Sequence, residues 1–341
     1  MKFWDREKEK EWLKRYLLSE PNAILFVYGP KSSGKTTLLM KVIEDLKGKI
    51  DPYYYDLRLV PISSYKDVLR IFFRERGWRE RLVSAIPGIA KTFSRYFEVD
   101  AEVLKEIFDM KYNPFEVMEN VLKGRRSRTG KVQVIVFDEL QKLKDVYLNS
   151  PNNQRSLVKE LFNFFVRLTK VLHLSHVIVM TSDTFFIEEV YTDSTLKNTS
   201  RFFLVDFFSD ELAKEILEKE GMNEEDASYA ADWIGGVPWM MEEVIEGGKG
   251  VVKELYESEK ARFKEIFGKL YEEDPSLRDE AKKLLKKILT GEEVDLDGKD
   301  RKMIKKLVDM EALYYDPVKG VVKFQTKLDE RAAKELLGAV G

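Results

Sequence analysis

Residues 29–36 have the sequence GPKSSGKT, which matches the pattern G-x-x-x-x-G-K-[ST] without a gap. The apolar run 22–28 (NAILFVY) stands directly before this segment and predicts a strand that is buried on both faces. Residues 36–46 return to helical spacing, so strand, glycine-containing turn and helix begin a βαβ unit. Such a turn presents backbone N–H groups that wrap phosphates. The predicted phosphate-binding residues are Gly29, Pro30, Lys31, Ser32, Ser33, Gly34, Lys35, Thr36 and Thr37.

Two acidic residues, Asp138 and Glu139, follow another apolar run, 132–137 (VQVIVF), which predicts a second buried strand. In a site of this kind Lys35 would contact the β- and γ-phosphates, while the hydroxyl of Thr36 and the carboxylate of Asp138 would hold Mg²⁺. Glu139 would polarise the attacking water, so the pair predicts hydrolysis of ATP to ADP. The alternative is a pair of acids that caps the next helix.

Further strands are predicted at 51–59, 176–180 and 201–205, where short aromatic or apolar runs alternate with helical patterns. This alternation predicts an α/β fold with a mainly parallel sheet, typical of P-loop proteins. From Ser209 onward the sequence predicts helices until a short hairpin near the carboxyl end.

The chain therefore divides into three predicted domains. These are a P-loop core at 1–208, a helical lid at 209–278 and a carboxyl-terminal domain at 279–341. Several helical patterns at 64–122 predict a helical insertion in the core. The basic segment 123–131 (KGRRSRTGK) predicts a loop, either a solvated turn or a contact to phosphate or nucleic acid.

Composition excludes several other classes of site. The 341 residues contain no cysteine, which removes disulfides and thiolate chemistry, and two histidines, His173 and His176, which predict packing rather than a metal site. The 58 basic and 60 acidic side chains nearly cancel, and their abundance is typical of proteins from hot environments. The charged amino terminus and the lack of a long apolar run predict a cytoplasmic protein with no membrane partner.

Four segments in order carry a family resemblance over residues 1–330. They are Arg6-Glu7 within FWDREKE, the Walker motifs GPKSSGKTT and VIVFDELQKL, the arginine-bearing TSRFFLVDFFSDELAKEIL, and the G-x-P segment GGVPWMM. The chain resembles archaeal P-loop ATPases of the AAA+/STAND type (signal-transduction ATPases with numerous domains). It departs from AAA+ motors because the lid has no arginine of the sensor-2 type, which favours the STAND branch.

The resemblance implies further site residues. Ser182, or Thr181 beside it, would be a polar sensor near the γ-phosphate; the alternative is a helix N-cap. Arg201 would neutralise transition-state charge in its own or an adjacent chain; the alternative is a surface strand arginine.

Two residues of the resemblance would contact the nucleoside. Pro238 would pack against the base or ribose; the alternative is a proline at the first position of a helix. Arg6, with Glu7, would line the adenine end; the alternative is a solvated helix.

Residues 279–335 predict helix, helix, hairpin and helix, an order that resembles a winged helix. Its second helix is basic, whereas an acidic turn at 292–297 precedes it and would repel phosphate. Two functions therefore stay open: a switch ATPase whose lid and winged helix respond to nucleotide state, and an ATP-licensed DNA-binding protein. Either function leaves the protein client or signal and the oligomeric state undefined. The basic residues of this predicted domain are Lys299, Arg301, Lys302, Lys305 and Lys306 on the second helix, and Lys319 and Lys323 on the hairpin.

Overall fold

The computed structural model describes residues 4, 6–59, 61–78, 96–150 and 153–338. The chain forms two compact units. The sheet unit consists of Asp5–Tyr28 and Lys35–Leu204, and the second unit consists of Met1–Trp4, Gly29–Gly34 and Val205–Gly341. Residues 79–95 of the predicted helical insertion lie outside the described residues.

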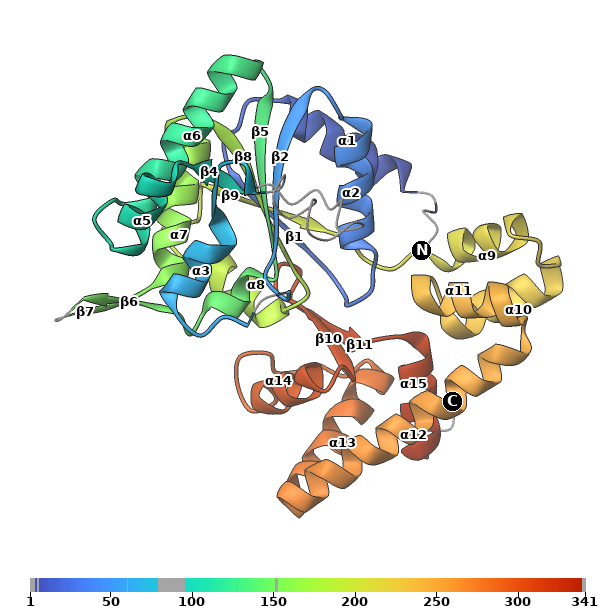
Figure 1. Ribbon diagram of the computed structural model, residues 1–341. Helices are drawn as coiled ribbons and strands as arrows, with labels where there is room; N and C mark the ends of the chain where they lie inside the picture. The colour runs from blue at the N-terminus through green and yellow to red at the C-terminus, as the bar shows by residue number, and fades with distance from the viewer. Residues whose placement is uncertain (1–3, 5, 60, 79–95, 151–152, 339–341) are drawn as a thin grey trace. The chain divides into compact units, whose positions relative to one another are not determined.

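A five-stranded parallel sheet forms the centre of the sheet unit, in the order β2-β5-β8-β1-β9 (Figure 1). This confirms the predicted α/β fold class. The central strands β1, β5 and β8 are buried almost throughout, which explains why they appear in the sequence as continuous apolar runs. The strands are β1 (Ile24–Tyr28), β2 (Ile50–Asp56), β5 (Val132–Asp138), β8 (Ser175–Thr181) and β9 (Ser200–Leu204).

Helices cover both faces of this sheet. Tyr16 and Trp12 of α1 pack on His176 and Phe203 on one face, while Phe162 of α7 packs on Phe26 on the other. Because successive strand residues point to opposite faces, both sets of apolar side chains are used. The helices are α1 (Glu7–Leu18), α2 (Lys35–Asp45), α3 (Tyr65–Phe72), α5 (Ala101–Phe108), α6 (Pro114–Thr129), α7 (Leu157–Val166) and α8 (Thr184–Thr192).

His176 confirms the predicted packing role, because its side chain is fully buried and its Nε2 lies 3.0 Å from the carbonyl of Ser19. Burial lowers the pKa of His176 to about 4. Between pH 6.5 and 4 the imidazole of His176 is protonated in the unfolded chain but stays largely neutral in the folded chain. The free energy of unfolding should therefore fall by about 3 kcal/mol from pH 6.5 to pH 4. Urea unfolding of the wild type and His176→Gln at both pH values measures this difference. His173→Gln should keep the wild-type loss, and an equal loss in His176→Gln would contradict the assignment.

The predicted basic loop at 123–131 is wrong. Helix α6 continues to Thr129 and ends at Gly130, whose φ of 64° is suited to a residue without a Cβ. Arg125 forms an ion pair with Asp51 of β2, and Arg126 donates to the carbonyl of Leu174 over 3.2 Å. These arginines hold the end of α6 against the sheet.

Two small strand pairs supplement the sheet unit. β3 (Phe73–Glu75) and β4 (Phe97–Val99) pair in parallel, and β6 (Tyr147–Ser150) and β7 (Asn153–Ser156) form a hairpin between β5 and α7. Neither pair was predicted, because each strand is too short to show a periodicity in sequence.

The described residues of the second unit form helices and one two-stranded hairpin. The predicted order helix, helix, hairpin, helix is present after residue 274, although α12 runs as one long helix from the lid toward it. The elements are α9 (Asp210–Lys219), α10 (Glu224–Ile234), α11 (Pro238–Gly247), α12 (Gly250–Glu273), α13 (Pro275–Thr290), α14 (Arg301–Asp309), β10 (Leu313–Asp316), β11 (Val321–Phe324) and α15 (Lys327–Leu336).

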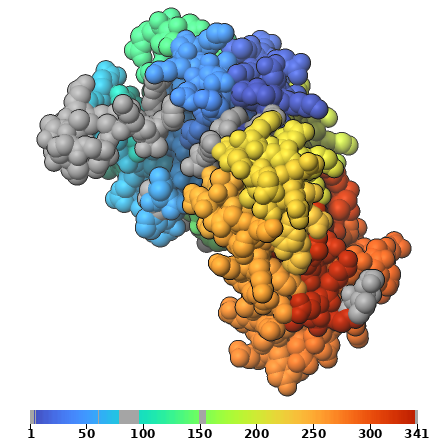
Figure 2. Space-filling model, turned by 90° about the vertical axis from the view of Figure 1, so that its right-hand side faces the viewer, coloured from blue at the N-terminus to red at the C-terminus, as the bar shows by residue number. Residues whose placement is uncertain are grey.

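Helix α15 ties the predicted lid to the carboxyl-terminal elements. Arg331 pairs with Asp232 of α10 at 2.8 Å and lies 4.6 Å from the Trp233 ring, and Lys327 pairs with Asp210 of α9 at 2.5 Å. Figure 2 shows the yellow and orange lid helices and the red α15 as one continuous surface. The lid and the carboxyl-terminal elements thus belong to one compact unit.

Asp329 is the most buried charge of this attachment, with 1% of its surface exposed. It accepts from Thr326 in a capping box and pairs with Arg262 of α12. Asp329→Ala removes one of the two carboxylates beside Arg262, leaving Glu259 at 2.6 Å, and it also removes the helix cap with Thr326, so thermal unfolding should show a loss of about 2–4 kcal/mol. Glu330→Ala, next to it and half-buried, is the control and should cost less than about 1 kcal/mol. Equal small losses for both variants would contradict this role of Asp329.

Candidate functional site

The carboxyl ends of neighbouring parallel strands gather polar side chains at one edge of the sheet. β8 lies between β1 and β5, so Ser182 after β8 stands next to Asp138 at the end of β5. Lys35 begins α2, and the loop before it follows β1. Ligands of open α/β sheets bind at this edge.

The backbone of the loop Gly29–Gly34 requires its glycines. Gly29 has a φ of 149°, and a Cβ there would lie 2.2 Å from the carbonyl oxygen of Val205. Gly34 has a φ of 88°, and Ser32 between them adopts a φ of 59°. Left-handed residues of this kind turn successive N–H groups inward, the geometry that binds anions.

The other loop side chains differ in exposure. Pro30 and Ser33 are buried, whereas Lys31 is exposed and its Nζ lies 2.6 Å from the carboxylate of Glu311 in the same unit. Thr37 is half-buried in the first turn of α2.

Lys35 is buried with 9% of its surface exposed. Burial lowers the pKa of its ammonium group to about 8, while the carboxylates of Glu139 and Asp138 oppose the shift. The side chain therefore carries its charge at neutral pH in a place shielded from water, where attraction to phosphate is strong.

Asp138 accepts three hydrogen bonds on Oδ2. The hydroxyl of Tyr54 donates over 2.7 Å, the guanidinium of Arg58 over 2.9 Å and the hydroxyl of Thr36 over 3.3 Å. Burial raises the pKa of Asp138, while Tyr54 and Arg58 oppose this. The adjacent hydroxyl and carboxylate oxygens are ligands of the kind that Mg²⁺ prefers, so Thr36 and Asp138 fit this ion.

Glu139 has a left-handed backbone with φ 65° and ψ 48°, which costs a residue with a Cβ about 1–3 kcal/mol. Its N–H donates to the carbonyl of Met180 on β8 over 2.8 Å. Ser182 donates to its carboxylate over 3.4 Å, and the amide of Gln141 donates to the second carboxylate oxygen. Thr181 in turn donates to Gln141 over 2.9 Å, so this network orients the carboxylate.

The helix N-cap that was the alternative for Ser182 and Thr181 belongs to Asp183. Its carboxylate accepts from the N–H of Phe186 over 2.9 Å at the start of α8. Ser182 is thus available for Glu139, as a sensor-like residue requires.

Arg6 is buried with 6% of its surface exposed, although its neighbour Glu7 is exposed and pairs with Lys10. The guanidinium of Arg6 contacts Glu9 over 3.2 Å, and its charge is among those that lower the pKa of Lys35. A plain solvated helix therefore does not describe Arg6.

Arg201 is not brought to the carboxylates. Arg201 is exposed on the edge strand β9, in register with Leu25 and three residues before the strand ends. Pro238 is the buried first residue of α11 in the second unit, as the helix-start alternative requires.

Tyr54, Arg58 and Gln141 are site residues that the sequence interpretation missed. The sequence signal for Arg58 is Asp-Leu-Arg at the end of β2, the strand next to β5 with its Asp138-Glu139 pair. Gln141 lies two residues after Glu139.

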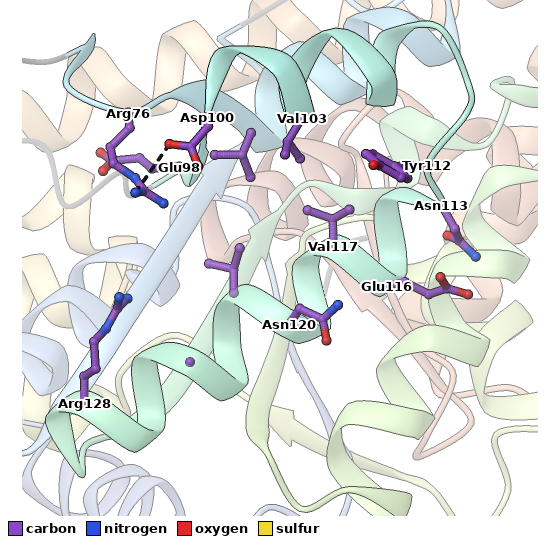
Figure 3. Close-up of a pocket in the computed structure, with 13 residues that line it drawn as sticks. Arg76, Glu98, Asp100, Val103, Tyr112, Asn113, Glu116, Val117, Asn120 and Arg128 are labelled. Atoms are coloured by element: carbon purple, nitrogen blue, oxygen red, sulfur yellow. Dashed lines mark ion pairs between the residues drawn. The ribbon is translucent and has the colours of Figure 1, made fainter.

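A separate hollow of about 600 Å³ lies in the insertion between β4, α5 and α6, where Arg76 pairs with Asp100 at 3.4 Å (Figure 3). Its lining, within residues 76–128, does not include the Walker residues.

A family model described as an ATPase domain predominantly from Archaea matches residues 3–244. The chain belongs to this archaeal ATPase family. The predicted resemblance to archaeal P-loop ATPases is thereby confirmed. Among the described residues, no helix combines the length and apolar character needed to span a membrane.

Relatives of this chain match it over nearly its whole length. An ATP-binding protein of Methanocaldococcus jannaschii is 36% identical over 351 residues, covering 100% of this chain and 98% of the relative. An ATP-binding protein of Pyrococcus abyssi is 32% identical over 343 residues, covering 98% of each.

Solved structures show the same fold. A Walker-type ATPase of Pyrococcus abyssi has a TM-score of 0.64 at 16% identity, covering 97% of this chain and 96% of that one. The ORC2 protein of Aeropyrum pernix, solved with nucleotides, has a TM-score of 0.50 at 12% identity, covering 99% and 95%. Both similarities concern the fold alone.

Proposed function

We propose that this protein binds ATP with Mg²⁺ and hydrolyses it at the sheet edge. The observation that carries the proposal is the pair of Thr36 and Asp138, whose side-chain oxygens lie 3.3 Å apart. The neighbouring Glu139 carboxylate is oriented by hydrogen bonds from Ser182 and Gln141. The relatives described as ATP-binding proteins support the ATP-binding part of this proposal.

Each residue has a chemical role in this proposal. Lys35 neutralises the β- and γ-phosphates, and Mg²⁺ held by Thr36 and Asp138 would supply further charge neutralisation there. Glu139 accepts the proton of a water whose oxygen attacks the γ-phosphorus, and the bond to the ADP oxygen breaks. Ser182 and Gln141 keep the Glu139 carboxylate oriented.

We further propose that nucleotide state acts on the second unit as one body. The loop Gly29–Gly34 belongs to this unit, and Lys31 in it pairs with Glu311 before β10. The ion pairs of α15 with α9 and α10 support joint movement of the lid and the carboxyl-terminal elements.

Hydrogen exchange tests this switch. Comparison of ADP and a non-hydrolysable ATP analogue should change the exchange of 205–278 and 279–335 together, while the central strands stay protected. Lys35→Ala in the same nucleotides is the control and should show no difference. Identical exchange of the wild type in both nucleotides, with binding verified, would contradict the switch.

The alternative, ATP-licensed DNA binding, gains no support from the charges of the second unit. Lys306 pairs with Glu273, and Lys323 pairs with Asp206 at 3.0 Å. A phosphate contact from either of these two lysines must break an existing ion pair, which lowers the affinity that the contact adds.

A further inference from the structure

Arg58 joins the two carboxylates at the ends of β2 and β5. Its Nη2 donates to Asp138 over 2.9 Å, and its Nε donates to Asp56 over 2.9 Å. Its backbone N–H also donates to Asp56, over 3.0 Å. Asp56 and Asp138 are register partners on parallel strands, so one planar guanidinium spans both.

The oxygen of Asp138 that Arg58 contacts is already crowded. Tyr54 and Thr36 donate to the same Oδ2. Three donors already share the two lone-pair sites of this oxygen, so a cation that binds to it from the side of Thr36 competes with them.

Arg58 is the donor that can leave most easily. Tyr54 is buried with 4% of its surface exposed, and Thr36 is the other proposed metal ligand. The side chain of Arg58 is 48% exposed and keeps Asp56 as a second partner when it moves. Its positive charge is also repelled by any other cation at Asp138.

We infer that Arg58 competes with Mg²⁺ for the Asp138 carboxylate and so sets how strongly nucleotide binding depends on the metal. The inference deepens the proposed ATP site and rests on it. Without metal, Arg58 balances Asp138, which would otherwise repel the phosphates. With metal, Arg58 withdraws to Asp56, which acts as its anchor.

The dissociation constant of N-methylanthraniloyl-ADP, measured by fluorescence in EDTA and in saturating Mg²⁺, tests this inference. The informative quantity is the ratio of the constant in EDTA to that in Mg²⁺. Arg58→Gln should raise this ratio roughly threefold to tenfold, because it weakens binding without metal and removes the competitor of the metal. Arg58→Lys keeps the positive charge but lacks the planar guanidinium that spans both carboxylates. Its ratio should therefore lie between the ratios of the wild type and of Arg58→Gln.

Arg70→Gln is the matched control. It also removes one positive charge, from an exposed pair with Asp67 on α3, and should keep the wild-type ratio. A ratio in Arg58→Gln that is unchanged or lower overturns the inference, and so does an Arg58→Lys ratio outside the predicted interval. Failure of the wild type to bind the nucleotide in either buffer would instead overturn the proposed function.

Discussion

Glu139→Gln should lower steady-state release of phosphate from ATP about 100-fold or more, because an amide cannot accept the proton of the attacking water. ATP binding should persist, since Lys35, Thr36 and Asp138 stay in place. Phosphate release at saturating ATP and Mg²⁺, together with the affinity for a non-hydrolysable analogue, measures both quantities.

Glu44→Gln is the control for this variant. It removes a carboxylate from α2 that is exposed and contacts Lys41 over 3.1 Å. We expect wild-type turnover there. Wild-type turnover in Glu139→Gln would remove this residue from the mechanism.

Lys35→Ala should weaken binding of ATP by roughly 100-fold, because it deletes the buried ammonium that faces the phosphates. Burial lowers the pKa of Lys35, so the charge is unfavourable in the folded protein, and its removal should not destabilise the fold. Calorimetric titration with ATP measures the affinity, and thermal unfolding checks the stability.

Lys41→Ala supplies the comparison within the same helix. Lys41 pairs with Glu44 and Asp45 and should not affect ATP affinity when it is removed. ATP affinity that is equal in Lys35→Ala and the wild type would place the nucleotide elsewhere.

The sheet could be predicted from the sequence because its strands are buried on both faces. The runs 22–28 and 132–137 are apolar without interruption, and each was placed within two residues of β1 and β5. The phosphate loop was predicted because its glycines and lysine are consecutive in the chain. Local patterns of this kind need no knowledge of long-range contacts.

The remaining features depend on contacts between distant segments. Arg58 and Asp138 are 80 residues apart in sequence and meet because β2 and β5 are adjacent. The basic end of α6 resembled a loop because its arginines look solvated in sequence, whereas Arg125 pairs with the buried Asp51. Tertiary contacts overrode the local signal in both places.

Arg201 shows the same limit for a family resemblance. The motif predicted a role at the γ-phosphate, but the register of β9 against β1 sets this residue opposite Leu25. Its exposure on the edge strand leaves a role toward an adjacent chain as a prediction.

The central proposal is that ATP is hydrolysed at the Walker carboxylates. The most direct test is to identify the nucleotide that stays bound after one turnover. Wild type and Glu139→Gln are mixed with Mg²⁺ and equimolar ATP, passed through a desalting column, denatured, and analysed by ion-exchange chromatography. The proposal predicts ADP on the wild type and ATP on the variant. ADP on both proteins in equal amount, or unchanged ATP on the wild type after prolonged incubation, would contradict it.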